Sequence, residues 1–331
     1  MLKRLPVESL LRAKVMRGEL ILRTLASSCA TSNPMSIKLE VRQVAAAGRG
    51  LFTKDPISHG QVLYRQAPLV ACPGLGATGK LESVCSNCLA FFSQDSRKTA
   101  DRVEFCGDDC ESAAQETFLG VQRKLELAPL QEHCRRHNIR FPLLVARLAF
   151  MCLSKQASPD SLSSLCFAKP PEPLPISWVE EYTILRGVLE KAGFTADSLS
   201  FLSLPWYVKQ ISRLHINVFR VELVKPLNPA DWLSAAAASI GTGGSGAAGS
   251  GVYLLPSMMN HSCDPNIDVL FPENNFKMEL TARRDISAGE ELLITYIDAA
   301  AHVEVRRSEL QWAYGFSCQC PRCNEEASLI K

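Results

Sequence analysis

The sequence predicts an α+β protein with a substantial hydrophobic core. Apolar and polar residues alternate across 36–71, and short strand-like segments return after Val252. Helical apolar spacing fills residues 111–215, as in FPLLVARLAFMCL. The segregation of strand-like ends from a helical middle places the chain in the α+β class.

Composition limits the classes of protein to which the chain can belong. Hydrophobic residues make up 47% and charged residues 21% of 331 residues, values typical of a soluble globular protein. No apolar run reaches the ~18–20 residues of a membrane-spanning helix. The formal charge of +2 provides no bulk attraction to nucleic acid or anionic lipid. We therefore expect neither a membrane nor a nucleic acid as a direct partner. The protein is also expected to be a monomer.

Individual elements can be placed along the chain. Strands are expected near 37–44, 51–53 and 61–71, and VYLLPSMM is read as a hydrophobic strand. A helix is expected over 303–314, with Trp312 packed in the core or against the helix. The prolines of KPPEPLP break the helical region.

A glycine-rich segment follows the helical region and matches GxGxxG at Gly241, Gly243 and Gly246. A dinucleotide site needs a strand before this motif and a helix after it. Here an Ala-rich, helix-like stretch precedes and a strand-like stretch follows, so the segment is predicted to be a flexible Gly/Ser/Ala loop.

Residues 1–35 form a basic N-terminal extension, with six basic and two acidic side chains. An Arg-rich, Ser-bearing amphipathic segment is typical of an organellar transit peptide, and the alternatives are a disordered tail or an upstream extension before Met16 or Met35. A secretory signal is not expected. The nucleus or cytoplasm is the predicted location, with an organelle as the alternative.

Thirteen cysteines occur without a secretory signal, so their clusters are interpreted as metal ligands. The spacing Cys85-x-x-Cys88 with Cys106-x-x-x-Cys110 predicts one closed, structural zinc site. The tail motif FSCQCPRC supplies three more ligands, Cys318, Cys320 and Cys323.

A tetrahedral zinc ion in the tail needs a fourth ligand. Cys263 in NHSCDPN is the favoured candidate, and His261 is the alternative. Two zinc ions per chain are therefore expected. If Cys263 is the ligand, the tail is pinned beside Asn260 and His261.

These motifs together resemble a known family. NHSCDPN, GEELLITY (residues 289–296) and the tail CxCxxC resemble a SET domain with its post-SET zinc site, and GRGLF resembles the opening SET strand and turn. The first cysteine cluster stands where the SMYD family carries a MYND zinc finger within the SET domain. FPENNFKMELTA is most similar to the divergent fifth SMYD member. The resemblance covers residues 36–324 and implies small β-sheets with the SET pseudoknot, an inserted MYND-like finger, a helical region and a post-SET zinc site.

The resemblance also suggests domain boundaries. The basic extension is followed by the first part of SET (36–84), the MYND-like finger (85–110) and the helical insert (111–215). The core SET (216–300), the post-SET segment (301–324) and a tail (325–331) complete the predicted order.

The finger departs from the family pattern. A MYND finger binds two zinc ions through interleaved cysteine pairs, but the middle pair is absent here, and the later positions expected to hold ligands are Phe118 and Gln122. We therefore predict a degenerate finger with one zinc. His133, Cys134 and His137 could form a replacement site, although the favoured interpretation is a helix surface.

The family implies transfer of a methyl group from S-adenosylmethionine (AdoMet) to a lysine of a histone or of a non-histone protein such as a ribosomal one. A catalytically silent SET/MYND-like scaffold is the alternative. A zinc-dependent hydrolase is disfavoured because both metal sites are closed and no HExxH motif is present.

The family also implies roles for individual residues. Tyr296 is the predicted catalytic residue and is expected to orient the amine rather than act as a base, because a phenol has a pKa near ~10. Tyr314 is expected to line the lysine channel. Glu290 and Glu291 are interpreted as turn surface. The residues expected to bind AdoMet are Arg49, Gly50, Asn217, Asn260, His261, Tyr296 and Phe316, the last by stacking on adenine.

Overall fold

The computed structural model describes residues 37–45, 47–74, 84–92, 97–98, 104–224 and 245–329. The basic extension, and Gly241 and Gly243 of the glycine-rich segment, lie outside them. Described residues form two compact units. The first holds residues up to Gln66 with Leu255–Val269 and the chain from Glu279, and the second holds 67–254 with 270–278.

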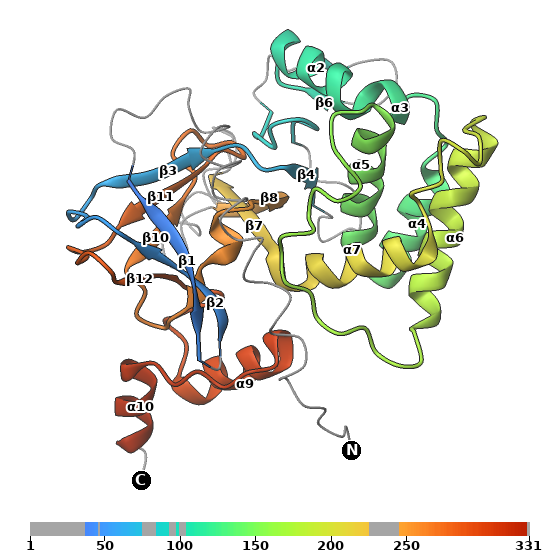
Figure 1. The fold of residues 1–331 in the computed structure, drawn as a ribbon. Helices are drawn as coiled ribbons and strands as arrows, with labels where there is room; N and C mark the ends of the chain where they lie inside the picture. The colour runs from blue at the N-terminus through green and yellow to red at the C-terminus, as the bar shows by residue number, and fades with distance from the viewer. Residues whose placement is uncertain are drawn as a thin grey trace, which may run out of the picture. The chain divides into compact units, whose positions relative to one another are not determined.

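The first unit is built around a four-stranded sheet of order β1-β2-β12-β9. β1 (Leu39–Val44) and β2 (Gly48–Thr53) form an antiparallel hairpin, blue in Figure 1. β12 (Glu291–Ile294) pairs antiparallel with β2 and parallel with the short β9 (Asn260–His261). Because this pairing is parallel, the carboxyl ends of β9 and β12 lie next to each other.

A second sheet has the order β10-β11-β3. Its strands are β10 (Ile267–Leu270), β11 (Met278–Ala282) and β3 (Val62–Gln66). Two helices close the chain, α9 (Val303–Tyr314) and α10 (Pro321–Ser328), and they pack on one another (red in Figure 1). α9 ends at Gly315, whose φ of 79° is the left-handed C-cap conformation that glycine adopts without strain.

The second unit packs helices on a three-stranded sheet of order β4-β8-β7. The strands are β4 (Val70–Pro73), β7 (Val218–Val224) and β8 (Ser245–Val252). α5 (Phe141–Leu153) is the central helix: it is buried along 142–150 and packs against β4 and α7. The other elements of this unit are β5 (Arg97–Lys98), β6 (Glu104–Phe105), α2 (Asp108–Ala114), the π-helical turn Gln115–Leu119, α3 (Gly120–Gln122), α4 (Ala128–His137), α6 (Ile176–Lys191) and α7 (Leu204–Asn217).

Two of the strand expectations are wrong in detail. The segment 61–71 is two strands, β3 and β4, which separate at residues 67–69 and enter different sheets. VYLLPSMM is not a strand either, because β8 ends at Val252 and Pro256–Met258 is a short 3-10 helix. Proline at the first position of that turn favours the helical start over continued pairing.

The glycine-rich segment was predicted to be a loop, but the part of it that the structure describes is a strand. Residues from Ser245 form β8, the central strand of the second unit's sheet. A Cβ atom at Gly249 would stand 2.4 Å from the backbone oxygen of Cys72 on β4. The small residues therefore allow a neighbouring backbone to approach closely, a role that composition alone does not distinguish from flexibility.

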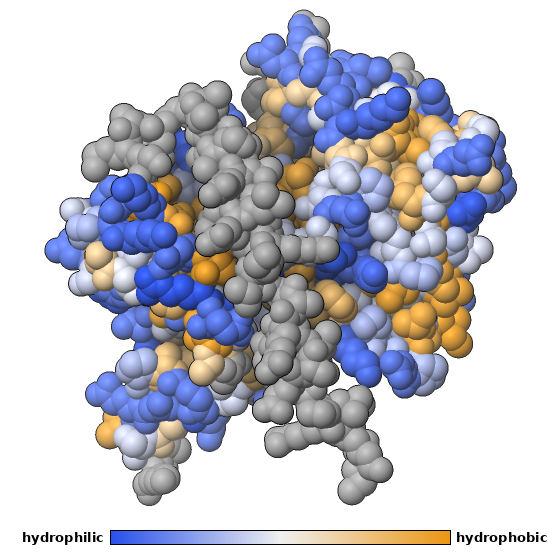
Figure 2. Space-filling model, viewed as in Figure 1, coloured by the Kyte–Doolittle hydropathy of each residue, from blue (hydrophilic) through white to orange (hydrophobic). Residues whose placement is uncertain are grey.

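Trp312 is 88% exposed, so its expected core position is wrong. The buried positions of α9 are Val303, Arg306 and Leu310, which recur at helical spacing, and Trp312 falls outside that stripe. Figure 2 shows hydrophobic surface (orange) over the helices of the second unit, where Ile176 is 76% exposed. Among the described residues, no helix has the length and apolarity needed to span a bilayer.

The strand assignment of the glycine-rich segment can be tested with two alanine variants. We expect Gly249→Ala to reduce the free energy of unfolding by about 1–3 kcal/mol, because the added methyl group overlaps Cys72 of the paired strand. Gly187, inside α6, has no atom within 4 Å of a Cβ, so Gly187→Ala should stabilise the chain by up to about 1 kcal/mol. Chemical denaturation measures both changes, and a neutral Gly249→Ala would argue against a tightly paired β8.

Candidate functional site

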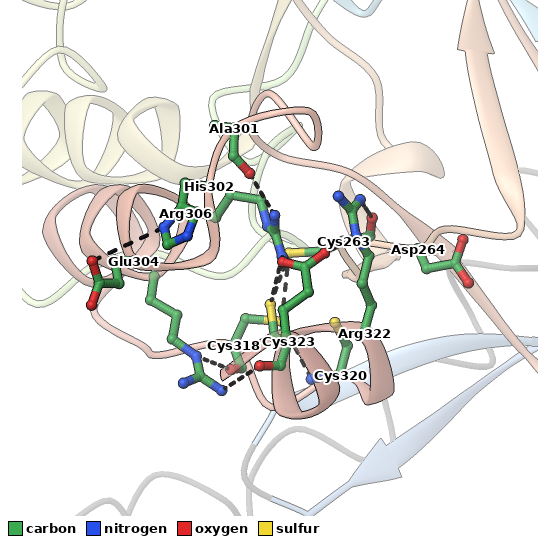
Figure 3. Close-up of polar contacts among 12 residues, drawn as sticks. Cys263, Asp264, Ala301, His302, Glu304, Arg306, Cys318, Cys320, Arg322 and Cys323 are labelled. Carbon is green, nitrogen blue, oxygen red and sulfur yellow. Dashed lines mark hydrogen bonds and ion pairs between the residues drawn. The ribbon is translucent and has the colours of Figure 1, made fainter. Parts of the chain in front are cut away.

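Four cysteines from two distant segments meet in the first unit. The sulfur atoms of Cys263, Cys318, Cys320 and Cys323 all lie within 4.8 Å of one another. Cys323 Sγ is 3.4 Å and Cys318 Sγ 3.9 Å from Cys263 Sγ. Figure 3 shows the yellow sulfur atoms gathered between the loop of Cys263 and the start of α10. The tail is thereby held against the NHSCDPN segment.

The four thiols fit a zinc ion. Zinc with Zn–S bonds of ~2.3 Å separates tetrahedral sulfur ligands by about 3.8 Å, close to the distances found here. Burial raises the pKa of Cys263, and the neighbouring Cys323 raises it further. Such crowded thiols ionise together only if a cation compensates their charge, and a divalent metal ion does so.

Arg306 is a buried charged residue that donates to a sulfur atom of this group, and sequence reasoning missed it. Its side chain is 1% exposed, and its Nη2 atom donates to Cys323 Sγ at 3.4 Å and to Glu326 at 2.6 Å. A guanidinium here offsets the net negative charge of four thiolates around one zinc ion. The sequence offered one signal for this role: Arg306 shares a helical face with Val303 and Leu310 in the helix that precedes the CxCxxC motif.

His261 links the thiol group to Tyr296. Its Nδ1 accepts a hydrogen bond from the Tyr296 backbone N–H at 3.0 Å, and its Nε2 lies 3.3 Å from Cys263 Sγ. Burial, reinforced by Arg306, lowers the pKa of His261 to about 4, so the ring is neutral at physiological pH. A neutral ring that accepts at Nδ1 carries its proton on Nε2 and donates it to the sulfur. His261 therefore contacts the group without belonging to it.

Three aromatic rings gather around this histidine and form with it a cluster of four rings. The ring centroids of Tyr296 and Tyr314 are 4.8 Å apart, and His261 lies 5.3 Å from Tyr296 and 6.1 Å from Phe316. Tyr314 ends α9 and Phe316 follows Gly315, so the chain turn and the thiol group together bring both rings here. The structure thus assembles four residues that lie up to 55 positions apart in the sequence.

The hydroxyl of Tyr296 has a defined orientation. It donates to the backbone oxygen of Met259 at 2.6 Å. Tyr296 follows β12 and Met259 precedes β9, so the tyrosine side chain reaches back along the paired strands to make this bond. The hydroxyl proton is therefore directed at Met259, and a phenolic oxygen that donates its proton is also able to act as an acceptor.

Asn260 is held by a residue assigned to turn surface. Its Nδ2 atom donates to Glu291 Oε1 at 2.7 Å, so the interpretation of Glu291 as turn surface is wrong. Glu291 is half-buried at the start of β12, whereas Glu290 pairs with Arg284. The carboxylate of Glu291 fills the space where a Cβ of Gly50 would stand, 2.2 Å from its Oε1. Gly50 thus admits the side chain that orients Asn260.

Asn266, the last residue of NHSCDPN, anchors this segment to β12. It is 1% exposed, its Nδ2 donates to Glu291 O at 2.8 Å, and its Oδ1 accepts from Leu293 N at 2.8 Å. A buried amide that satisfies two backbone groups of β12 fixes the position of its own segment along that strand. Its role was not assigned from the sequence.

Two other predicted cofactor residues have contacts within their own units. Arg49 lies on β2, half-buried and opposite Gln43 of β1. Asn217 is the last residue of α7 in the second unit, is 5% exposed, and donates to the backbone oxygens of Cys166 and Arg213. Their contacts do not test AdoMet binding, and both assignments stay predictions.

The first cysteine cluster forms a separate group in the second unit. The sulfur atoms of Cys85, Cys88, Cys106 and Cys110 all lie within 4.8 Å of one another, with Cys88–Cys106 at 3.6 Å and Cys106–Cys110 at 3.4 Å. Burial and Cys110 raise the pKa of Cys106 to about 12. As in the tail, these distances and crowded thiols fit one zinc ion.

The positions at which the family pattern expects further ligands are otherwise used. Phe118 is 3% exposed in the core of the second unit, and the guanidinium carbon of Arg147 lies 3.9 Å from the centre of its ring. Arg147 donates in turn to the backbone oxygens of Ala71 and Ser86, next to the first cysteine pair. An aromatic–cation contact therefore supports the finger where the family places a second metal.

Comparison with known proteins agrees with this architecture. The SET domain family model matches residues 48–297, which contain both strands of the Asn260–Tyr296 region. The chain belongs to the SET-domain family. The expected SET fold and the resemblance to SET and MYND proteins are confirmed.

Several relatives of this SET protein are known. It is 38% identical over 287 residues to the histone-lysine N-methyltransferase ATXR4 of Arabidopsis thaliana, covering 86% of each chain. It is 27% identical to a SET and MYND domain-containing protein of Dictyostelium discoideum, covering 82% of this chain and 78% of the relative. Over 82 residues it is 48% identical to the protein-lysine N-trimethyltransferase SMYD5 of Gallus gallus, or 24% of this chain and 20% of that one.

The metal assignment predicts a stoichiometry. We expect about two zinc ions per chain after desalting with a weak chelator, one per cysteine group. Cys263→Ser and Cys106→Ser should each lose one ion, whereas Cys152→Ser, outside both groups, should lose none. Elemental analysis measures the ratio, and a reading of zero would contradict both ligand sets.

The contact of Gly50 with Glu291 predicts non-additive energetics. Gly50→Ala should reduce the free energy of unfolding by about 1–3 kcal/mol, because its methyl group displaces the carboxylate from Asn260. Glu291→Ala removes the obstacle, so the double variant should be more stable than the sum of the single effects implies. Denaturation of all four proteins gives the coupling; strict additivity would show that the two positions do not interact.

Proposed function

We propose that this SET protein transfers a methyl group from AdoMet to the ε-amine of a lysine in a protein substrate. The observation that carries the proposal is the ring cluster of Tyr296, Tyr314, Phe316 and His261, held beside a four-thiol group. Membership of the SET family and the 38% identity to a named histone-lysine methyltransferase support it.

The residues in the cluster fit the cofactor. Phe316 offers an aromatic face for adenine, and Asn260 offers an amide fixed by Glu291 for polar groups of the cofactor. When bound, AdoMet supplies a reactive methyl group on a positively charged sulfur. These residues bind and orient, and they need no change of protonation to do so.

The substrate amine must be neutral, although a free lysine has a pKa near ~10.4. A nearby positive charge and loss of water both disfavour the protonated amine, so a strong protein base is not required. Tyr296 then positions the amine, because its bond to Met259 fixes the direction of a hydroxyl oxygen that can accept from an amine N–H.

Tyr314 is suited to bind the alkyl stem. Its ring is in contact with that of Tyr296, at a centroid distance of 4.8 Å, and the two rings together offer an aromatic surface against which an alkyl stem can pack. Burial raises the pKa of Tyr314, which keeps it a neutral phenol. The pair therefore favours a lysine side chain over an acidic or bulky one.

The substrate is a protein, and histone and ribosomal proteins are the two classes to compare. Transfer of a labelled methyl group from AdoMet to core histones and to ribosomal proteins, side by side, identifies the class. Calorimetry with AdoMet separates the enzyme from a catalytically silent scaffold: no binding heat at high micromolar AdoMet would favour the scaffold.

Tyr296→Phe should reduce methyl transfer by about 100-fold or more, because the amine loses its positioning oxygen. AdoMet affinity should survive, since the ring and its neighbours remain. Tyr64→Phe is a matched control that removes another hydrogen-bonded tyrosine hydroxyl from the same unit, bonded to Gln66 at 2.6 Å, and it should remain active. Turnover like that of the wild type in Tyr296→Phe would remove Tyr296 from its assigned role.

A further inference from the structure

A third group of potential ligands lies in the helical part of the second unit, where the chain has no cysteine pair. His133 and His137 are one turn apart on α4, and their ring centroids are 4.5 Å apart. Glu180 faces them from α6, which packs against α4. One ligand atom from each of the three residues lies within 4.8 Å of the other two.

His133 is the buried member of this group. Its side chain is 8% exposed, and its Nε2 has no hydrogen-bond partner among the described residues. A buried imidazole nitrogen without a partner is unfavourable, so the ring is held here by its surroundings rather than by its own bonds. Cys134, next to it, is fully buried in the core and does not belong to the group.

A buried carboxylate lies beside the same histidine. Glu181 Oε1 is 4.0 Å from His133 Nε2, too far for a hydrogen bond, and Glu181 Oε2 accepts a hydrogen bond from the Tyr207 hydroxyl at 2.8 Å. The ring of His133 is fixed by its burial, while the exposed His137 and Glu180 can turn toward it.

We propose that His133, His137 and Glu180 bind a divalent transition-metal ion such as Zn²⁺. Two imidazoles and one carboxylate suit zinc and its neighbours in the first row, whereas Mg²⁺ and Ca²⁺ prefer oxygen ligands throughout. Zinc spaces such ligand atoms by about 3.3 Å, which the exposed side chains reach by rotating.

The surroundings define the kind of site. The group borders a surface hollow that is also lined by Arg136 and by Ile176, Val179, Thr183 and Ile184 of α6. Arg136 is directed toward Glu132, at 3.7 Å, so its charge is partly compensated. Three protein ligands leave a coordination position open to water or to an added ligand. The site is therefore exchangeable and joins α4 to α6, unlike the two closed cysteine groups.

Cobalt titration distinguishes this site from the cysteine groups. The full chain, with both cysteine groups loaded with zinc and free metal removed, is titrated with Co²⁺ under equilibrium dialysis. We expect one additional Co²⁺ per chain, with weak visible absorption and without the sulfur-to-cobalt charge-transfer band of a thiolate site.

His137→Ala and Glu180→Gln should each lose the additional Co²⁺, and both residues are exposed, so the variants should fold. His302→Ala is the matched control, because His302 lies 4.0 Å from a single carboxylate, Glu304, and has no third ligand in the metal-binding groups of the described residues. It should retain the ion. No additional Co²⁺ in the wild type, a charge-transfer band on its binding, or full binding by His137→Ala would each overturn the proposal.

Discussion

The attachment of three tail thiols to Cys263 is the constraint on which the candidate site depends. Cys318, Cys320 and Cys323 stand more than fifty residues beyond Cys263, and without a shared metal ion four thiols, three of them buried, would have little reason to meet. Once they do, Gly315 and the end of α9 present Tyr314 and Phe316 to His261 and Tyr296. The metal centre is structural, yet it builds two of the four rings into the site. The buried guanidinium of Arg306 donates to Cys323 and Glu326, and its positive charge offsets part of the negative charge of the thiolates.

The other half of the site depends on the pairing of two very short strands. β9 has only two residues, and a parallel pair of that length is weak by itself. Asn266 strengthens it through two backbone contacts with β12, and Glu291 adds a side-chain bond to Asn260. Gly50 makes room for that carboxylate. Gly50 of GRGLF therefore permits close packing within the sheet, and its predicted contact with AdoMet stays a prediction.

The two cysteine groups illustrate different uses of the same chemistry. In the tail, the thiols position the residues of a reaction site. In the finger they stabilise a turn beside β6 and α2, and the neighbouring position Phe118 is filled by a ring under Arg147. The degenerate finger thus keeps one complete ligand set and replaces the other with hydrophobic and cation–π packing. The helical unit that follows carries a further histidine and glutamate group of its own, built from two packed helices.

The sequence by itself determined the family, the first cysteine ligand set, the three tail ligands with Cys263 favoured over His261 as the fourth, the helix over 303–314 and the identity of the four rings. These features depend on short spacings, and ligand or helix periodicity is a local property of the chain. Only the tertiary structure decided that Glu291 orients Asn260, that Arg306 lies beside the thiols, that Trp312 is exposed, and that SGAAGSGV is a central strand. Each of these depends on which distant segment packs nearby. A glutamate after a glycine turn has the same local sequence pattern whether it faces water or another strand, and so does a run of small residues. Only the position of the neighbouring segment in the fold distinguishes an exposed site from a packed one.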